Sequence, residues 1–357
     1  MQPEMLRVQS ISTTAGCANA LSDRAIGVLG SSTLASWVLL IARALQQRGI
    51  EPEPLFRRAG LPSARVEDAN ARYPLAAMQR LWHLGAQATR DPCFGLEVGR
   101  LWHPTTFQAL GYAALASASL RDALANLVRY CHVVSTGVAL ELVDRTDEVD
   151  LVVASRGSRH LTAAGHATQA AMAAIVTLCR QARSGSVLLH RVTLTRDERE
   201  GWTRLEEFFG CPVESGMQDA LVFGSHEIDA PLDTFNQELL RLNREHVAHY
   251  LASLEVADFP GQVRLQIARL LPSGVADADV VAHAMNLSRR TLQRRLRVHD
   301  TSFRRLLDET RQDLARQYIQ DATLSMAEVA CLLGFAETSS LSRAMRRWRA
   351  PVTHAED

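Results

Sequence analysis

Four side chains that could read DNA share one face of a short predicted helix over residues 288–298. They follow the i, i+3, i+4, i+7 spacing of a single helical face and are Arg290, Gln293, Arg294 and Arg297. Arginine can form two parallel hydrogen bonds to guanine, and glutamine can do so to adenine, at base edges in the major groove. The residue types and their spacing therefore predict a helix that contacts DNA bases.

The segment around this helix is repeated 49 residues later along the chain. The apolar Leu292 aligns with Leu341, and both predicted helices carry arginines on the opposite face. In the turn before each helix, where the offset is 48 residues, Asn286 aligns with Gly334, and both residue types tolerate the left-handed backbone conformation. Each copy therefore predicts a helix, a tight turn and a second helix, which is the helix-turn-helix arrangement.

The charge distribution places a basic patch in the same region. The 357-residue chain has 39 arginines, no lysine and 39 acidic residues, so its formal net charge is zero. From residue 261 onward there are 15 arginines against 11 acidic residues, and residues 288–305 hold seven arginines and one aspartate. A basic patch in a neutral protein is typical of a polyanion site, with a solvated helix face as the alternative.

The composition argues against several enzyme classes. A chain without lysine has no Walker A loop, no lysine Schiff base and no kinase-type nucleotide lysine. The six cysteines form no CxxC pair, and His246 and His249 lack an obvious third ligand, so no zinc site or disulfide framework is predicted. We expect a protein that is not an enzyme and has no cofactor or metal; an enzyme carried on a DNA-binding domain is the alternative.

Helical and strand periodicities divide the chain into four parts. The expected fold class is an α/β N-terminal domain, with helices first and a small sheet after, followed by an all-α DNA-binding domain. In the latter, two helix-turn-helix units are joined by a long helix over residues 302–320. Phe259-Pro260-Gly261 is expected to end the preceding linker helix. The expected boundaries are a flexible tail at 1–31, the α/β domain at 32–230, a helical linker at 231–260 and the DNA-binding domain at 261–357.

No signal peptide or membrane-spanning segment is predicted. The first residues lack a basic region followed by an apolar run, and the apolar stretch 35–45 is short and contains Arg43. We therefore expect a cytoplasmic protein with no membrane partner. Arginine at every basic position, together with abundant alanine, is typical of GC-rich bacterial coding.

The C-terminal motifs carry a family resemblance. Residues 261–348 resemble the paired helix-turn-helix domain of the AraC/XylS family of bacterial transcription regulators. The matching strings are AxxMNLSRRTLQRRL from Ala282, SFxxLLxxxRxxxAxxY from Ser302, LSMAEVAxLLGF from Leu324 and SLSRAMRRW from Ser340. One departure follows the tryptophan, where residues 350–353 read Ala-Pro-Val-Thr instead of the usual Gly-x-x-Pro pattern.

The N-terminal part resembles the arabinose-binding-like domain of one branch of that family. The strings that carry this resemblance are DPxFGLEVG from Asp91, LGYA from Leu110, SLxxAL from Ser119 and FGCPV from Phe209. The resemblance implies a domain that senses a small molecule or supports dimerisation. Five aromatic residues could line an effector pocket or simply form the core: Trp82, Trp102, Phe107, Tyr112 and Tyr130.

The resemblance also implies how DNA is bound. The two helix-turn-helix units would enter successive major grooves, roughly 34 Å apart, with the 302–320 helix as a rigid spacer. Arg311 on this spacer is expected to be structural or to contact the DNA backbone. The implied base-reading residues are Arg290, Gln293, Arg294, Ser339, Ser342 and Arg343. The implied phosphate-contacting residues are Ser288, Arg289, Thr291, Arg297, Thr338, Arg346 and Arg347.

These inferences predict a sequence-specific DNA-binding transcription regulator that acts as an activator. The first reader has the fuller set of base-reading side chains, so we expect it to carry most of the specificity and the second to add affinity. Some of the arginines could instead be solvated, or paired with Asp308 or Glu309. The expected partners are promoter DNA, RNA polymerase, a small-molecule effector and a second copy of the chain. The alternative is the same regulator with a ligand-free N-terminal oligomerisation domain.

Overall fold

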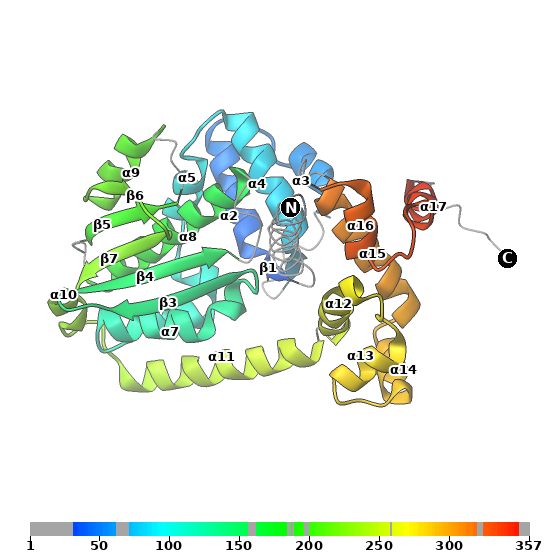
Figure 1. Cartoon of the computed structure of the whole chain (residues 1–357). Coiled ribbons are helices and arrows are strands. Elements are labelled where there is room, and N and C mark those ends of the chain that lie inside the picture. Colours follow the sequence, from blue (N-terminus) through cyan, green and yellow to red (C-terminus); the bar gives the residue numbers. More distant parts are fainter. Residues whose placement is uncertain are drawn as a thin grey trace, which may run out of the picture. The chain divides into compact units, whose positions relative to one another are not determined.

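The chain forms two compact units, which are described separately (Figure 1). The first unit comprises residues 31–255 and the second contains residues from 256 onward. The structure, a computed structural model, describes residues 31–61, 71–155, 162–183, 187, 189–195, 200–257, 259–319 and 324–349. The predicted tail up to residue 30 and the atypical sequence at 350–353 lie outside the described residues.

Helices make up the first part of the N-terminal unit, as predicted. Their apolar faces converge on one core that includes Ile41, Leu81, Phe94 and Leu124, all with side chains almost fully buried. These helices are α2 (Ser36–Gln47), α3 (Glu53–Ala59), α4 (Leu75–Thr89), α5 (Phe94–Arg100), α6 (Ala109–Leu115) and α7 (Leu120–Val134). The 3-10 helix η2 (Pro104–Phe107) and a two-stranded sheet of β1 (Ser32–Leu34) and β2 (Arg72–Pro74) accompany them.

A five-stranded sheet follows, in the spatial order β3-β4-β7-β5-β6. All neighbouring strands are antiparallel except β5 and β6, which are parallel. The strands are β3 (Val138–Asp144), β4 (Glu148–Ser155), β5 (Leu189–Leu194), β6 (Val213–Ser215) and β7 (Ala220–Gly224). Helices α8 (Thr162–Ala182), α9 (Trp202–Phe209) and α10 (Ser225–Asp229) lie between or after them. The predicted α/β fold class, with helices before a small sheet, is confirmed.

Helix α5 was not predicted, although it lies inside the DPxFGLEVG string. Two glycines in seven residues lower its intrinsic helix propensity. The glycines instead permit close packing on α8, because a Cβ on Gly95 would lie 2.1 Å from the carbonyl oxygen of His166. A Cβ on Gly99 would lie 2.5 Å from the carbonyl oxygen of Ala170. The two glycines of this string therefore allow α5 to pack closely on α8.

Helix α11 (Gln237–Ala257) packs on the N-terminal unit. Val247 is buried in the main core of that unit, and Leu240 packs with Ala113 and Ala116. The Arg244 side chain donates from Nε to Oδ1 of Asn126 on α7, at 2.8 Å. The helix that the sequence suggested as a linker thus has its own packing contacts within residues 31–255.

The C-terminal unit is all helical, as predicted. Its core includes Phe259, Leu292, Leu314 and Leu341. Its elements are α12 (Phe259–Leu270), η3 (Leu271–Ser273), α13 (Ala278–Ala284), α14 (Arg289–Val298), α15 (Phe303–Ile319), α16 (Met326–Leu332) and α17 (Thr338–Arg349). Among the described residues, no helix has the length and apolar character needed to cross a bilayer.

One helix boundary was predicted wrongly. Phe259-Pro260-Gly261 does not end a helix but forms the first turn of α12. Proline is tolerated there because the first amides of a helix have no intrahelical partner. The Phe259 ring is buried, stacks on His299 and lies under the guanidinium of Arg295. This tripeptide therefore begins the core of the C-terminal unit.

Candidate nucleic-acid interface

The first predicted reader is helix α14, and its local sequence explains where it begins. The Ser288 hydroxyl caps the helix by accepting a hydrogen bond from the backbone N–H of Thr291 at 3.2 Å. Leu292 and Leu296 are fully buried in the core of the C-terminal unit, as their one-turn spacing predicted. Burial of this narrow apolar stripe orients the rest of the helix toward solvent.

The predicted base-reading face of α14 is exposed. This face carries four long polar side chains, Arg290, Gln293, Arg294 and Arg297. They make no hydrogen bond, ion pair or ring contact with any residue that the structure describes. Other arginines, such as Arg121 and Arg191, pair with carboxylates. The donors on this face are therefore available to an external acceptor.

Both helix-turn-helix units have the predicted left-handed residue in the turn. Asn286 has φ of 54° and Gly334 has φ of 65°. At Gly334 the chain also passes close to η3, since a Cβ there would lie 2.7 Å from the carbonyl oxygen of Leu271. The aligned positions thus share a backbone conformation, and the second turn requires glycine for steric reasons as well.

Helix α17 is the second predicted reader. Fewer of its predicted base-reading side chains lack a local partner among the described residues than on α14. Leu341 is fully buried at the position equivalent to Leu292. Two of the three predicted base-reading side chains already have local partners. Ser339 Oγ donates to the Glu337 carboxylate at 2.9 Å, and Arg343 donates to Ser340 Oγ at 3.1 Å. Ser342 is exposed and has no partner within the described residues.

The predicted phosphate-contacting residues fall into two groups. Arg289 pairs with Asp279 of α13 at 2.8 Å, and Arg347 pairs with Asp308 of α15. The Ser288 and Thr291 hydroxyls bond to each other at 2.9 Å. The remaining three are exposed and have no partner in the described part of the chain: Arg297, Thr338 and Arg346.

Arg311 on the spacer α15 stabilises the second unit from within. Its Nε donates to the carbonyl oxygen of Leu333 at 3.0 Å, and a terminal nitrogen donates to that of Gly334 at 3.1 Å. Its guanidinium also lies 4.5 Å from the ring centre of Phe335. Burial lowers the pKa of Arg311. These contacts favour the structural role over a DNA-backbone contact, because the donors are used on the turn.

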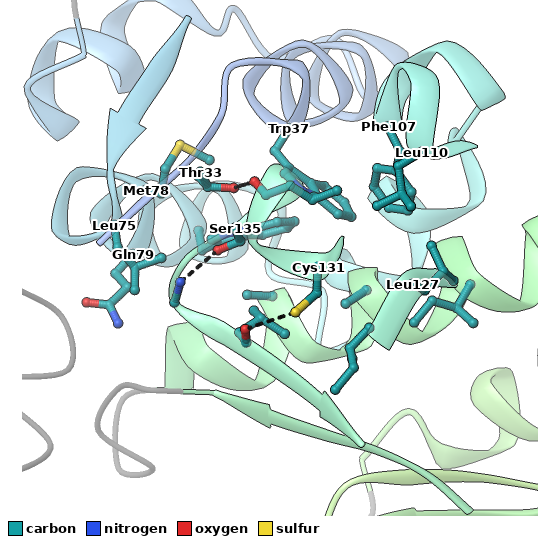
Figure 2. Close-up of a pocket in the computed structure, with 18 residues that line it drawn as sticks. Thr33, Trp37, Leu75, Met78, Gln79, Phe107, Leu110, Leu127, Cys131 and Ser135 are labelled. Carbon is teal, nitrogen blue, oxygen red and sulfur yellow. Dashed lines mark hydrogen bonds between the residues drawn. The ribbon is translucent and has the colours of Figure 1, made fainter. Parts of the chain in front are cut away.

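The N-terminal unit holds an apolar cavity with a volume of about 100 Å³ (Figure 2). Of the five predicted aromatic residues, only Trp82 and Phe107 line it. Trp102 packs behind Phe107, with 5.4 Å between ring centres, Tyr130 is buried in the core and Tyr112 is exposed. Trp37 also lines the cavity but was not among the predicted residues, although its place on the apolar face of α2 was a usable signal.

The sequence comparisons agree with these two units. Residues 281–350 match a family described as a helix-turn-helix domain. Residues 49–232, just over half of the chain, match the arabinose-binding domain of AraC transcription regulators, N-terminal. The chain belongs to the AraC family of transcription regulators. This AraC-family protein is a DNA-binding regulator with an arabinose-binding-like N-terminal domain.

Known regulators match most of this AraC-family chain. It is 27% identical to the ornithine utilization regulator of Pseudomonas aeruginosa, over 84% of this chain and 88% of that protein. It is 26% identical to the regulator VirS of Mycobacterium tuberculosis, over 85% of this chain and 90% of that one. The crystal structure of the transcriptional regulator CdpR from Pseudomonas aeruginosa matches with a TM-score of 0.44 and 22% identity. The match covers 84% of this chain and 93% of that one. The two sequence relatives are both described as regulators.

Proposed function

We propose that this regulator recognises specific promoter sequences through α14 and α17 and activates transcription. The observation that carries the proposal is the exposed Arg/Gln face of α14, whose side chains have no partner among the residues that the structure describes, with a second arginine-bearing face on α17. Base reading is assigned to Arg290, Gln293, Arg294, Ser339, Ser342 and Arg343. Phosphate contact is assigned to Ser288, Arg289, Thr291, Arg297, Thr338, Arg346 and Arg347.

The two readers are proposed to contribute differently. Arg290, Gln293 and Arg294 can approach base edges without first breaking a bond to any of the described residues. Ser339 and Arg343 must exchange a local partner for DNA, and Glu337 places a negative charge beside Ser339. These differences support specificity carried mainly by α14 and affinity added by α17. Arg289 and Arg347 likewise have to exchange Asp279 and Asp308 for a phosphate.

The N-terminal domain is proposed to sense a small molecule. The apolar cavity supports this, because voids of its size are few in a well-packed domain and a small apolar void can bind an apolar molecule. A domain that serves only for oligomerisation is the alternative. Saturating ligand should change promoter affinity in the first case, whereas a ligand-free oligomerisation domain would show no such response.

Activation is tested by transcription in vitro. Promoter sites are first found by genome-wide mapping of bound DNA in the source bacterium. We expect the purified regulator, added with that organism's RNA polymerase, to raise transcript yield from such a promoter several-fold. Arg294→Ala is the control for a site-specific effect. Lower transcript yield with the regulator would identify a repressor and reject activation, while leaving promoter recognition in place.

A homodimer is proposed through an exposed apolar stripe at the start of α11. Leu239 and Leu242 of α11 follow i, i+3 spacing and are 44% and 49% exposed, and Phe235, just before the helix, is 48% exposed. Apolar side chains at i, i+3 share one helical face, and a second copy could cover this face together with Phe235. We expect Leu239→Glu with Leu242→Glu to shift sedimentation from dimer to monomer. Met217→Glu, at an exposed methionine on another segment, is the matched control. Unchanged sedimentation of the double variant would remove α11 from the interface.

A further inference from the structure

We infer that the N-terminal domain responds to a small, uncharged and largely apolar molecule bound in the cavity of Figure 2. The inference rests on the proposed sensing function and specifies the chemistry of its ligand. The site lies where helices and both sheets of the unit meet. Its apolar walls include Trp37 of α2, Trp82 of α4, Phe107 of η2, Leu110 of α6, Leu127 of α7 and Ile175 of α8.

The lining excludes a charged ligand. None of the described residues that line the cavity is aspartate, glutamate, arginine or histidine. A buried carboxylate or ammonium group would lose its hydration and find no opposite charge in exchange. Amino acids, organic acids and phosphorylated sugars therefore do not suit this site.

The lining also disfavours a ligand with many hydroxyl groups, because most of its polar atoms already have partners. Thr33 Oγ1 donates to the carbonyl oxygen of Val134 at 3.0 Å, and Ser135 Oγ accepts from the N–H of Gly137 at 3.2 Å. Cys131 Sγ contacts the Val138 carbonyl oxygen at 3.8 Å. Figure 2 shows these three bonds directed within the cavity wall.

Gln79 provides one further polar group. Its half-buried side chain lines the cavity and has no hydrogen-bond partner among the residues that the structure describes. A carboxamide can donate to or accept from a neutral hydroxyl or carbonyl group. The ligand can therefore carry one neutral polar group next to this residue and remain apolar elsewhere.

The volume limits the size of the ligand. An apolar cavity of about 150 Å³, lined by residues such as leucine and phenylalanine, stays dry and binds benzene. At about 100 Å³, this cavity suits a single ring or a short hydrocarbon chain. Met78 in the wall is unbranched and flexible, so a small rearrangement can admit a ring with one substituent.

The cavity is connected to α11 through α7. Leu127 and Cys131 of α7 line the cavity, and the neighbouring Asn126 is buried. Asn126 donates to Ser117 Oγ at 3.0 Å and accepts from Arg244 of α11 at 2.8 Å. A ligand that displaces α7 would strain the partly buried bond between Asn126 and Arg244, and α11 is the helix that precedes the DNA-binding unit in the chain. Filling the cavity thus has a physical route to regulation.

The test uses the full-length protein with toluene, and with benzoate as a charged compound of similar size. We expect toluene to raise Tm by about 3 °C and benzoate to leave it unchanged. We also expect toluene to change promoter affinity by at least about threefold. Equal shifts with both compounds, or no shift with toluene, would overturn the inference.

Two substitutions on α8 locate the binding. Ala171→Leu fills the cavity and should abolish the toluene response, whereas Gln181→Leu adds the same side chain at an exposed position and should retain it. A toluene response that survives Ala171→Leu would place the ligand elsewhere. Because Ala171→Leu could disturb folding, Leu127→Ala is measured too, and should extend the response to ligands one ring larger.

Failure of the inference differs from failure of the sensing function. If a charged metabolite stabilises the protein and alters promoter affinity, the domain is a sensor but its ligand class is not the one inferred. If toluene binds in the cavity and promoter affinity stays constant, the cavity chemistry is correct and the sensing function is rejected.

Discussion

Arg294→Ala is expected to lower affinity for a specific promoter site by about 1–3 kcal/mol, roughly 5- to 150-fold, with little change on random DNA. Arg294 lies on the exposed face of α14, and its guanidinium has no partner among the described residues. Loss of a side chain that bonds a base edge removes discrimination between sequences, whereas a phosphate contact would weaken all DNA alike. Arg343→Ala should fall at the lower end of the range, because Arg343 must first leave Ser340.

The measurement is the dissociation constant for promoter and random duplexes at one fixed salt concentration. Arg269→Ala is the matched control, since Arg269 is an exposed arginine at the end of α12, outside both readers. Equal losses for Arg294→Ala and Arg269→Ala would point to general charge and contradict base reading by α14. Equal losses on the two duplexes would move Arg294 to the phosphate-contacting group.

Arg311→Met is expected to destabilise the second helix-turn-helix unit by about 2 kcal/mol. The substitution keeps an apolar side chain against Phe335 but removes both hydrogen bonds to the turn, leaving the Leu333 and Gly334 carbonyls without these donors. Arg311→Lys should recover only part of this loss, because a single ammonium cannot reproduce the planar guanidinium geometry. Since α17 follows this turn, promoter affinity should fall together with stability.

Hydrogen exchange on the full-length protein measures this effect locally, and Tm measures it globally. We expect faster exchange in α16 and α17 of Arg311→Met, with the N-terminal unit unchanged. Arg316→Met is the control on the same helix, because its exposed ion pair with Asp313 contributes little. If Arg311→Met matches Arg316→Met in stability and exchange, the turn does not depend on Arg311.

Features set by residues close together in the chain were predicted well from the sequence. The bounds of α9 follow from the local sequence, because an amphipathic period lies between Gly201 and Gly210. The positive φ at Asn286 and Gly334 also followed from residue type and repeat alignment. The exposed face of α14 followed from the burial of two leucines one turn apart.

Features that depend on residues far apart in the chain were decided by the tertiary structure. The three-residue strands β1 and β2 exist only because they pair across some forty positions, and α5 exists because its glycines fit against α8. The sequence predicted a family regulator with two arginine-faced helices. It could not tell Arg294, which has no partner among the described residues, from Arg347, because the partner Asp308 lies on another helix. Nor could it locate the cavity, since an unfilled volume depends on how all surrounding elements pack.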